Sequence, residues 1–364
     1  MSDVVSEAFV RWLSDVSGCD VINTSMIQPL WSGYGACFRA QLAPNSAAKL
    51  KNVAGNHHNK VPGDNGIRHV VVKCATPPDT LAHPKGWNGQ ASDERKRHSF
   101  RVENSFYSAL QTLTDDTCRT ATCVADDQKG DSTLLVMEDL ARGGYTHTTM
   151  SLSVESAKTV LKWLAHFHAR FLNIKFEENK KRVLLWHEGS YWHLATREEE
   201  YQAMPDSRLK QSARAIANRL ANARYQTVIH GDAKVANFCF TPDYAACAAV
   251  DFQYVGHGIG VKDVAYFLGS ALPTQAQITH RDALLGTYFG ALESALNTRL
   301  STNDTLCSFD RDDIKHVIEE WKTLYPFACA DFYRFLSGWS PTHWKIDEEL
   351  QYQTDIALSA LANT

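Results

Sequence analysis

A short polar stretch in the second half of the chain has the residue types that phosphoryl transfer needs. Residues 230–237 read His-Gly-Asp-Ala-Lys-Val-Ala-Asn, and apolar residues lie on both sides of them. This pattern predicts a loop between two short buried strands, a position that holds catalytic side chains rigidly. Because a carboxylate within hydrogen-bond reach can orient a hydroxyl and accept its proton, Asp232 is the predicted catalytic base.

Two further oxygen-bearing side chains follow at a spacing that suits a metal ion. Asn237 lies five residues after Asp232, and Asp251 follows the apolar run 245–250, fourteen residues after Asn237. An amide oxygen and a carboxylate make a hard, oxygen-only site with room for water and phosphate oxygens. Asn237 and Asp251 are therefore the predicted ligands of Mg²⁺.

This arrangement resembles the catalytic and metal-binding loops of the kinase-like fold. His-Gly-Asp at 230–232, where eukaryotic protein kinases have His-Arg-Asp, is similar to the aminoglycoside phosphotransferase and choline kinase group. Asp-Phe-Gln at 251–253 and the later stretch 263–268 (Asp-Val-Ala-Tyr-Phe-Leu) most resemble its ecdysteroid-kinase-like branch. The resemblance implies ATP-dependent phosphorylation of a hydroxyl on a small molecule.

Three residues near the loop take their expected roles from the resemblance. Lys234 stands where the group usually has an aromatic residue or histidine, and it matches the lysine two residues after the catalytic aspartate of protein kinases. It is predicted to neutralise the γ-phosphate. The resemblance implies that His230 hydrogen-bonds the backbone around the metal loop. Asp263 indicates first an N-cap worth about 1 kcal/mol, whereas the resemblance implies a brace for the catalytic loop.

A lysine and a glutamate upstream are predicted to form an ion pair. Residues 70–73 are a β-branched run ending in Lys73, which is similar to the strand lysine that contacts the α- and β-phosphates in kinases. Residues 101–110 have apolar side chains at helical spacing, with Glu103 beside that face. Thirty residues separate Lys73 from Glu103, which is longer than in compact kinases.

The remaining nucleotide contacts are predicted on both sides of this pair. Gly33 and Gly35 lie in a strand-turn-strand pattern that resembles the nucleotide-covering loop, although Ala36 is the nearest small residue to the missing third glycine. Strands are expected at 119–124 and 133–137, around a turn at 126–131. The second strand leads into Glu138 and Leu140, which resemble the connector between kinase lobes and are predicted to hold adenine through main-chain groups.

The order of these motifs predicts an α+β chain with the two-lobed, protein-kinase-like fold. An N-terminal helix at 1–19 is expected to pack on a small antiparallel β lobe at 20–140, which binds the nucleotide. Residues 141–364 are expected to form a larger, mainly helical lobe with the catalytic and metal loops and the substrate pocket. Its central buried helix is predicted after Ser153, with His168 as a core histidine. The resemblance implies that this histidine supports the catalytic loop.

Composition is that of an ordinary cytoplasmic enzyme. The 364 residues are 44% apolar with a net charge of −4, which gives no basic footprint for nucleic acid. The nine cysteines show no paired or zinc-binding spacing and indicate reduced thiols. No run of apolar residues is long enough for a membrane span, and the N-terminus lacks the apolar core of a signal peptide.

The sequence is compatible with three kinds of alcohol as the phosphate acceptor. Trp321, Tyr325 and Asp331 lie in an aromatic-rich stretch that would suit a choline-like cation, although aromatics at helical spacing more often form core. An aminoglycoside would need a ring of acids, and the acidic residues at 312–320 look instead like a capped, solvated helix turn. A steroid-like alcohol would need an apolar pocket.

Two other functions compete with a small-molecule kinase. Only twelve residues separate Asp251 from Asp263, too few for the peptide-docking segment of a protein kinase. A non-catalytic, nucleotide-binding pseudokinase or sensor is the stronger alternative, since the weakened glycine loop and Lys234 could mark a loss of catalysis. The sequence shows no signal for an oligomeric state.

Overall fold

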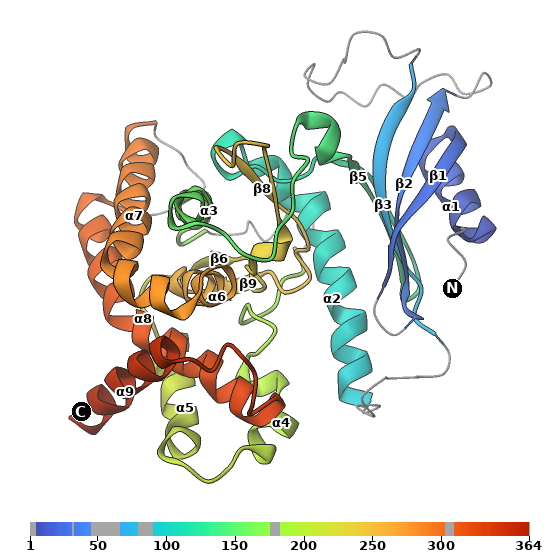
Figure 1. Cartoon of the computed structure of the whole chain (residues 1–364). Coiled ribbons are helices and arrows are strands. Elements are labelled where there is room, and N and C mark those ends of the chain that lie inside the picture. The colour runs from blue at the N-terminus through green and yellow to red at the C-terminus, as the bar shows by residue number, and fades with distance from the viewer. Residues whose placement is uncertain are drawn as a thin grey trace. The chain divides into compact units, whose positions relative to one another are not determined.

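The structure, a computed structural model, describes residues 5–30, 33–44, 66–78, 90–174, 183–302 and 309–363. They fall into two compact units, one drawn from Met1–Gln111 and Ala121–Gly143, the other from Thr112–Thr120 and Gly144–Thr364. The first unit contains a five-stranded antiparallel sheet and the second is mainly helical (Figure 1). The predicted α+β fold class is therefore confirmed. The polar insertions between β2 and β3 and before α2 lie mostly outside the described residues.

The sheet of the first unit has the strand order β1-β2-β3-β5-β4, with every neighbouring pair antiparallel. Side chains alternate along each strand, so Phe38 and Leu42 of β2 and Val70 and Val72 of β3 are buried on one face. The strands are β1 (Cys19–Pro29), β2 (Gly35–Pro44), β3 (Arg68–Ala75), β4 (Cys123–Lys129) and β5 (Ser132–Glu138).

Helix α1 (Glu7–Ser17) covers this buried face. Ser6 caps it by accepting a hydrogen bond from the Ala8 N–H at 3.3 Å. Trp12 and Leu13 join the apolar cluster of β2 and β3, and the Trp12 indole donates to Asp127 of β4 at 2.6 Å. The amphipathic N-terminal segment thus folds as a helix against the sheet.

Helix α2 (Gln90–Ala109) packs against β4 and β5. Val102 and Phe106 are fully buried, and Asn104 donates to the main-chain oxygen of Asp127 at 3.3 Å. These contacts fix the helical turn that carries Glu103.

Strand β4 departs from the sequence prediction at both ends. The strand expected at 119–124 begins only at Cys123, because Thr120 instead bridges to Ala249 in the second unit. The turn expected at 126–131 is confined to Gly130 and Asp131, and residues 126–129 continue the strand. The polar run is tolerated because β4 is an edge strand, whose outer side chains face solvent.

Helix α3 (Val154–Arg170) is the central helix predicted for the large lobe. The Ser153 hydroxyl caps it by accepting from the Ser156 N–H at 3.1 Å. It lies against α7 (Thr274–Ser301) (Figure 1). Its fully buried side chains include Val160, Leu161, Leu164 and Phe167.

Further helices and two short antiparallel ladders complete the described part of the second unit. Asp310 and Asp313 form a capping box at the start of α8, which confirms the capped helix turn expected there. The helices are α4 (Glu198–Ala203), α5 (Arg208–Ala221), α6 (Val261–Ala271), α8 (Arg311–Trp339) and α9 (Glu348–Ala362). Two short antiparallel ladders pair β6 (Thr227–Ile229) with β9 (Gly256–Gly258) and β7 (Phe238–Phe240) with β8 (Cys247–Ala249).

The described residues bear on the sequence predictions about membrane-spanning helices and about cysteines. In that part of the chain, no helix combines the length and apolarity of a membrane span. The eight cysteines within it are free thiols, and burial raises the pKa of Cys74 and Cys118 to about 12 each.

Candidate active site

The backbone of residues 230–232 is fixed by one buried carboxylate. Asp263 accepts hydrogen bonds from the N–H groups of His230 at 2.6 Å and Gly231 at 2.9 Å. Gly231 has φ 78°, and a Cβ there would lie 2.0 Å from the main-chain oxygen of Tyr254, so only glycine fits. The turn that follows β6 therefore depends on Gly231 and on the hydrogen bonds to Asp263.

Asp263 is itself held from the other side by a buried histidine. His168 of α3 donates from Nε2 to Asp263 at 3.1 Å, and its Nδ1 lies 2.9 Å from the Tyr288 hydroxyl. Helix α6 begins at Val261, so the N-cap reading of Asp263 was wrong: the carboxylate faces the catalytic loop instead. His168 is fully buried and supports the loop through Asp263, as predicted.

His230 has both ring nitrogens engaged with the main chain. Its Nδ1 accepts from the Asp232 N–H at 3.3 Å, and its Nε2 lies 3.0 Å from the Val250 oxygen. Because Nδ1 accepts, Nε2 must carry the proton that it donates to Val250. The ring also packs on Phe252 at 4.5 Å. His230 thus ties the catalytic loop to the segment before Asp251 and is not placed for proton transfer.

The carboxylate of Asp232 is oriented by two side chains of its own loop. Its Oδ2 accepts from Asn237 Nδ2 at 3.2 Å and from Lys234 Nζ at 3.0 Å. Asn237 Nδ2 also donates to the main-chain oxygen of Asp232 at 2.8 Å. With only 7% of the residue exposed, this carboxylate is held in one orientation at the rim of the second unit's interior.

Lys234 carries its charge between two carboxylates. Burial opposes that charge, but Asp232 and Asp251 outweigh it and raise the pKa of Lys234 above its ordinary value. The ammonium is therefore protonated at neutral pH, with 37% of the side chain exposed. Asp232, Lys234, Asn237 and Asp251 are thus brought together in one place.

The oxygens of Asn237 and Asp251 suit the predicted Mg²⁺. Asn237 uses its amide nitrogen for Asp232, so its amide oxygen is the atom left to bind a ligand. Asp251 has φ 68°, an unusual backbone for an aspartate that costs on the order of 1–3 kcal/mol and is typical of functional sites. The described residues contain no cluster of three or more His, Cys, Asp or Glu that could hold a metal. One carboxylate and one amide match Mg²⁺ that keeps water and phosphate oxygens as its other ligands.

The predicted ion pair of the first unit forms. Lys73 Nζ lies 2.7 Å from Glu103 Oε2, with 12% and 3% of the two side chains exposed. Lys73 lies between the buried Val72 and Cys74 on β3, so it points to the sheet face opposite α1. The long insertion between strand and helix therefore does not prevent the pairing.

The glycines before β2 occupy positions that demand glycine. Gly35 has φ 132°, and a Cβ there would lie 2.0 Å from the Cys74 oxygen of β3; Gly33 has φ 76°. The Leu30 N–H donates to the Gly35 oxygen at 2.8 Å. Phosphate binding by Gly33 and Gly35 stays a prediction.

The segment predicted to hold adenine begins at the end of β5. The Glu138 N–H donates to the Thr122 oxygen at 3.0 Å, and the Glu138 carboxylate accepts from the Thr122 N–H at 2.8 Å. The amide of Glu138 is thus already used. Leu140 is buried and starts a 3-10 turn, η4 (Leu140–Gly143). A role of Glu138 and Leu140 in adenine binding stays a prediction.

A family comparison agrees with this geometry. The model of the ecdysteroid kinase-like family matches residues 90–184 and 188–300, which is more than half of the chain. The chain belongs to the ecdysteroid kinase-like family. The matched residues include Glu103 and both loops of the second unit, whereas Lys73, Gly33 and Gly35 lie outside the match.

Solved structures of small-molecule kinases resemble this member of the ecdysteroid kinase-like family at low identity. The aminoglycoside-3'-phosphotransferase of type VIII is 13% identical, with 86% of this chain and 98% of that chain covered and a TM-score of 0.42. Ethanolamine kinase of Plasmodium vivax is 11% identical, with 93% and 82% covered and a TM-score of 0.40. A comparison with curated proteins gave no match.

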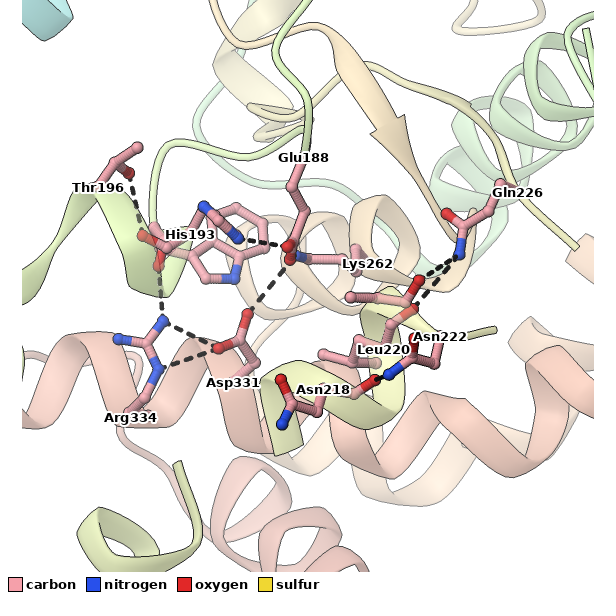
Figure 2. A network of polar contacts seen from close by, with 12 residues as sticks. Glu188, His193, Thr196, Asn218, Leu220, Asn222, Gln226, Lys262, Asp331 and Arg334 are labelled. Atoms are coloured by element: carbon pink, nitrogen blue, oxygen red, sulfur yellow. Dashed lines mark hydrogen bonds and ion pairs between the residues drawn. The ribbon is translucent and has the colours of Figure 1, made fainter. Parts of the chain in front are cut away.

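The aromatic stretch considered for a cation cage is core in this ecdysteroid kinase-like protein. Trp321 is fully buried and donates to the Tyr225 oxygen at 3.1 Å, and only 5% of Tyr325 is exposed. Asp331 accepts from Arg334 at 2.8 Å and lies 3.6 Å from Lys262 Nζ (Figure 2). These side chains therefore pair and pack within the protein and do not form a cage.

Figure 2 shows that Asp331 belongs to a closed network of charges. Lys262 of α6 also donates to Glu188 at 3.1 Å, and Glu188 pairs with His193. Burial raises the pKa of the Glu188 carboxyl, but Lys262 and His193 outweigh it and lower that pKa to about 2. In this network each carboxylate has a cationic partner.

The sequence reasoning missed two tyrosines beside Asp232. Burial raises the pKa of Tyr266 well above its ordinary value, and interactions with Tyr191 and Asp232, including hydrogen bonds, raise it further. The two rings meet edge to face at 5.4 Å, and the Tyr191 N–H donates to the Gly231 oxygen at 3.2 Å. Tyr266 follows Asp263 by one helical turn, so a helix through the brace could have predicted it. Tyr191 lies in an irregular segment that gives no such signal.

Proposed function

We propose that this protein is a kinase that transfers the γ-phosphoryl group of ATP to a hydroxyl of a small-molecule alcohol. The observation that carries the proposal is the buried carboxylate of Asp232, which Asn237 and Lys234 orient in a loop braced by Asp263. Membership of a kinase-like family supports the same reaction class. We also propose a cytoplasmic location, which the free thiols of the described cysteines support.

Asp232 acts on the acceptor. It orients the hydroxyl and takes its proton as the hydroxyl oxygen forms a bond to the γ-phosphorus. The bond between that phosphorus and the bridging oxygen breaks, which releases ADP. Because Asn237 already donates to Asp232, the carboxylate keeps a fixed donor when Lys234 turns towards phosphate.

The other predicted site residues serve the nucleotide. Asn237 and Asp251 would hold Mg²⁺, which when bound neutralises phosphate charge. Lys73, held by Glu103, contacts the α- and β-phosphates, and Lys234 faces the γ-phosphate. Gly33 and Gly35 bring the backbone of their turn close to the phosphates, while Glu138 and Leu140 contact adenine.

A non-catalytic nucleotide-binding protein is the second candidate. The observation that favours it is the 3.0 Å pair between Lys234 and Asp232, because an ammonium that neutralises the carboxylate makes it a weaker base. In a working kinase, Lys234 must turn towards phosphate when ATP binds. In a sensor it stays on Asp232.

Coupled ADP-release measurements separate the two candidates. Wild type, Asp232→Asn and Asp251→Ala are supplied with Mg·ATP and a panel of choline-like, aminoglycoside-like, steroid-like and anionic alcohols. We expect release stimulated by one class of alcohol and reduced roughly 10²–10⁴-fold in Asp232→Asn. Mg·ATP affinity should be kept in Asp232→Asn and weakened in Asp251→Ala. Retained turnover in Asp232→Asn would contradict the assignment of the base, and nucleotide binding without stimulated turnover would favour the sensor.

A further inference from the structure

A lysine far along the chain contacts a tyrosine of the candidate active site. Lys345 is in the connection between α8 and α9, and its Nζ lies 4.4 Å from the centre of the Tyr266 ring. Tyr266 hydrogen-bonds to Asp232 and packs on Tyr191, whose N–H donates to Gly231, so the ring beneath the ammonium belongs to the surroundings of the predicted base. Lys345 also interacts electrostatically with both Asp232 and Lys234.

Unlike Lys73, Lys234 and Lys262, the partly buried Lys345 has no carboxylate partner among the described residues. Lys73, Lys234 and Lys262 each pair with an acid at 2.7–3.1 Å. Among the described residues, no carboxylate or carbonyl binds the Lys345 ammonium, which contacts aromatic rings instead. Burial and the charge of Lys234 lower the pKa of Lys345 to about 8, against an opposing effect of Asp232. Binding of an anion to this unpaired ammonium would therefore be favourable.

An aromatic surface continues outward from the lysine. The Trp344 ring lies 5.5 Å from Lys345 Nζ and is 67% exposed. His343 stacks on Trp344 at 5.8 Å and contacts Trp339 at 5.7 Å, and Trp339 is 37% exposed. These rings offer apolar contact area beside an ammonium that no acid of the described segments pairs with.

The charges around Asp232 decide which alcohols fit. In the proposed function Asp232 serves the reaction and Asp251 the metal, and Lys345 forms an ion pair with neither of them. A cationic acceptor would be repelled by Lys345, and an acceptor with an anionic group would complete its pairing. We propose that Lys345 is an acceptor-binding residue that selects alcohols carrying an anionic group, with Trp344 contacting their apolar body. The proposal rests on the proposed function and narrows its substrate class.

Three probes that differ only in charge test the inference. They are 4-(hydroxymethyl)benzoate, 4-(hydroxymethyl)benzamide and 4-(hydroxymethyl)benzylamine, titrated calorimetrically into the full chain with Mg·ADP at pH 7. We expect the carboxylate to bind at least about tenfold more tightly than the amine, since the ammonium attracts one and repels the other. Lys345→Gln should abolish this preference, and Lys345→Arg should keep it. Unchanged Mg·ADP affinity in Lys345→Gln shows that the variant is folded.

Lys322→Gln is the matched control. Lys322 of α8 also lies over an aromatic ring, at 5.3 Å from Phe289, without touching the site residues described above, so its removal should leave the preference intact. Equal affinity for the three probes, no detectable binding of the carboxylate, or a preference that survives Lys345→Gln would overturn the inference. Binding is measured here without turnover. If the protein transfers phosphate but shows no preference for the anionic probe, the role of Lys345 is refuted and the proposed kinase function is not. Anion-selective binding without transfer to any alcohol would contradict the proposed function, and with it the acceptor role.

Discussion

Two charged clusters of the second unit use the same residue types but pair them to different degrees. In the network of Figure 2, Lys262 lies between Glu188 and Asp331, and Arg334 binds Asp331 through two nitrogens. Around Asp232 the pairing is looser. The side chain of Lys234, which pairs with Asp232, is 37% exposed. Among the described residues, the Lys345 ammonium contacts only aromatic rings.

The difference indicates what each cluster does. A buried charge is tolerated when every partner is present, and removing one partner then leaves an uncompensated charge in the interior. Such a cluster serves structure. The charges around Asp232 lie instead beside Asp251, with its left-handed backbone, and beside the glycine-dependent turn at Gly231, and these are the charges that we propose to bind ligands. The predictions that follow separate the two kinds of cluster.

The largest effect on stability should come from the closed network. Lys262→Met leaves Glu188 and Asp331 without their shared ammonium, and it should lower the free energy of unfolding by about 3–5 kcal/mol. ADP release per folded molecule should change little. Urea unfolding followed by tryptophan fluorescence measures the loss. Lys315→Met is the control, because Lys315 is 78% exposed in a 3.9 Å pair with Glu319 and should contribute less than about 1 kcal/mol. An equal effect of the two substitutions would remove the basis of the comparison.

The Lys73–Glu103 pair is an intermediate case, since it is both buried and proposed to bind nucleotide. Glu103→Gln keeps the shape but removes the charge that holds Lys73. We expect a loss of about 1–3 kcal/mol in unfolding free energy. The KM for Mg·ATP should rise roughly tenfold, about 1.4 kcal/mol. A KM that does not change, with stability reduced, would place this pair with the closed network.

The last predicted effect is a dependence of stability on acid pH. The pKa of Glu188 is lowered from 4.5 to about 2, so the folded state holds its proton less tightly than the unfolded state. Its stabilising contribution is therefore complete above about pH 4.5 and is lost as the pH falls towards 2. The difference in unfolding free energy between wild type and Glu188→Gln should shrink across this window, by no more than about 3 kcal/mol. A difference that stays constant would show that the ion pairs of Glu188 contribute nothing.

Local patterns in the sequence predicted the centre of the site but not its surroundings. Asp232, Asn237 and Asp251 lie at short, fixed spacings, and the alternation of β3 determines which way Lys73 points. Each of these needs only local information. Asp263 was ambiguous between a helix cap and a brace, because the choice depends on where α6 begins.

Residues that depend on long-range packing could not be predicted. Tyr191 and Lys345 come from irregular segments on either side of the motif, and only the packing of α6, α8 and α9 brings them to Asp232. For the same reason the sequence did not show that Asp331 forms ion pairs with Arg334 and Lys262. An acidic residue among aromatic residues gives the same sequence pattern in a cation cage and in a packed core. Only its partners in the structure distinguish the two.

The most direct test of the central claim follows the phosphoryl group itself. Wild type and Asp232→Asn are incubated with ATP labelled in the γ-phosphate, Mg²⁺ and the alcohol that best stimulates ADP release, with Mg·ATP affinity measured in parallel. We predict that wild type moves the label to the alcohol, and that Asp232→Asn binds Mg·ATP equally but transfers almost none. Transfer by Asp232→Asn at the wild-type rate would contradict the account.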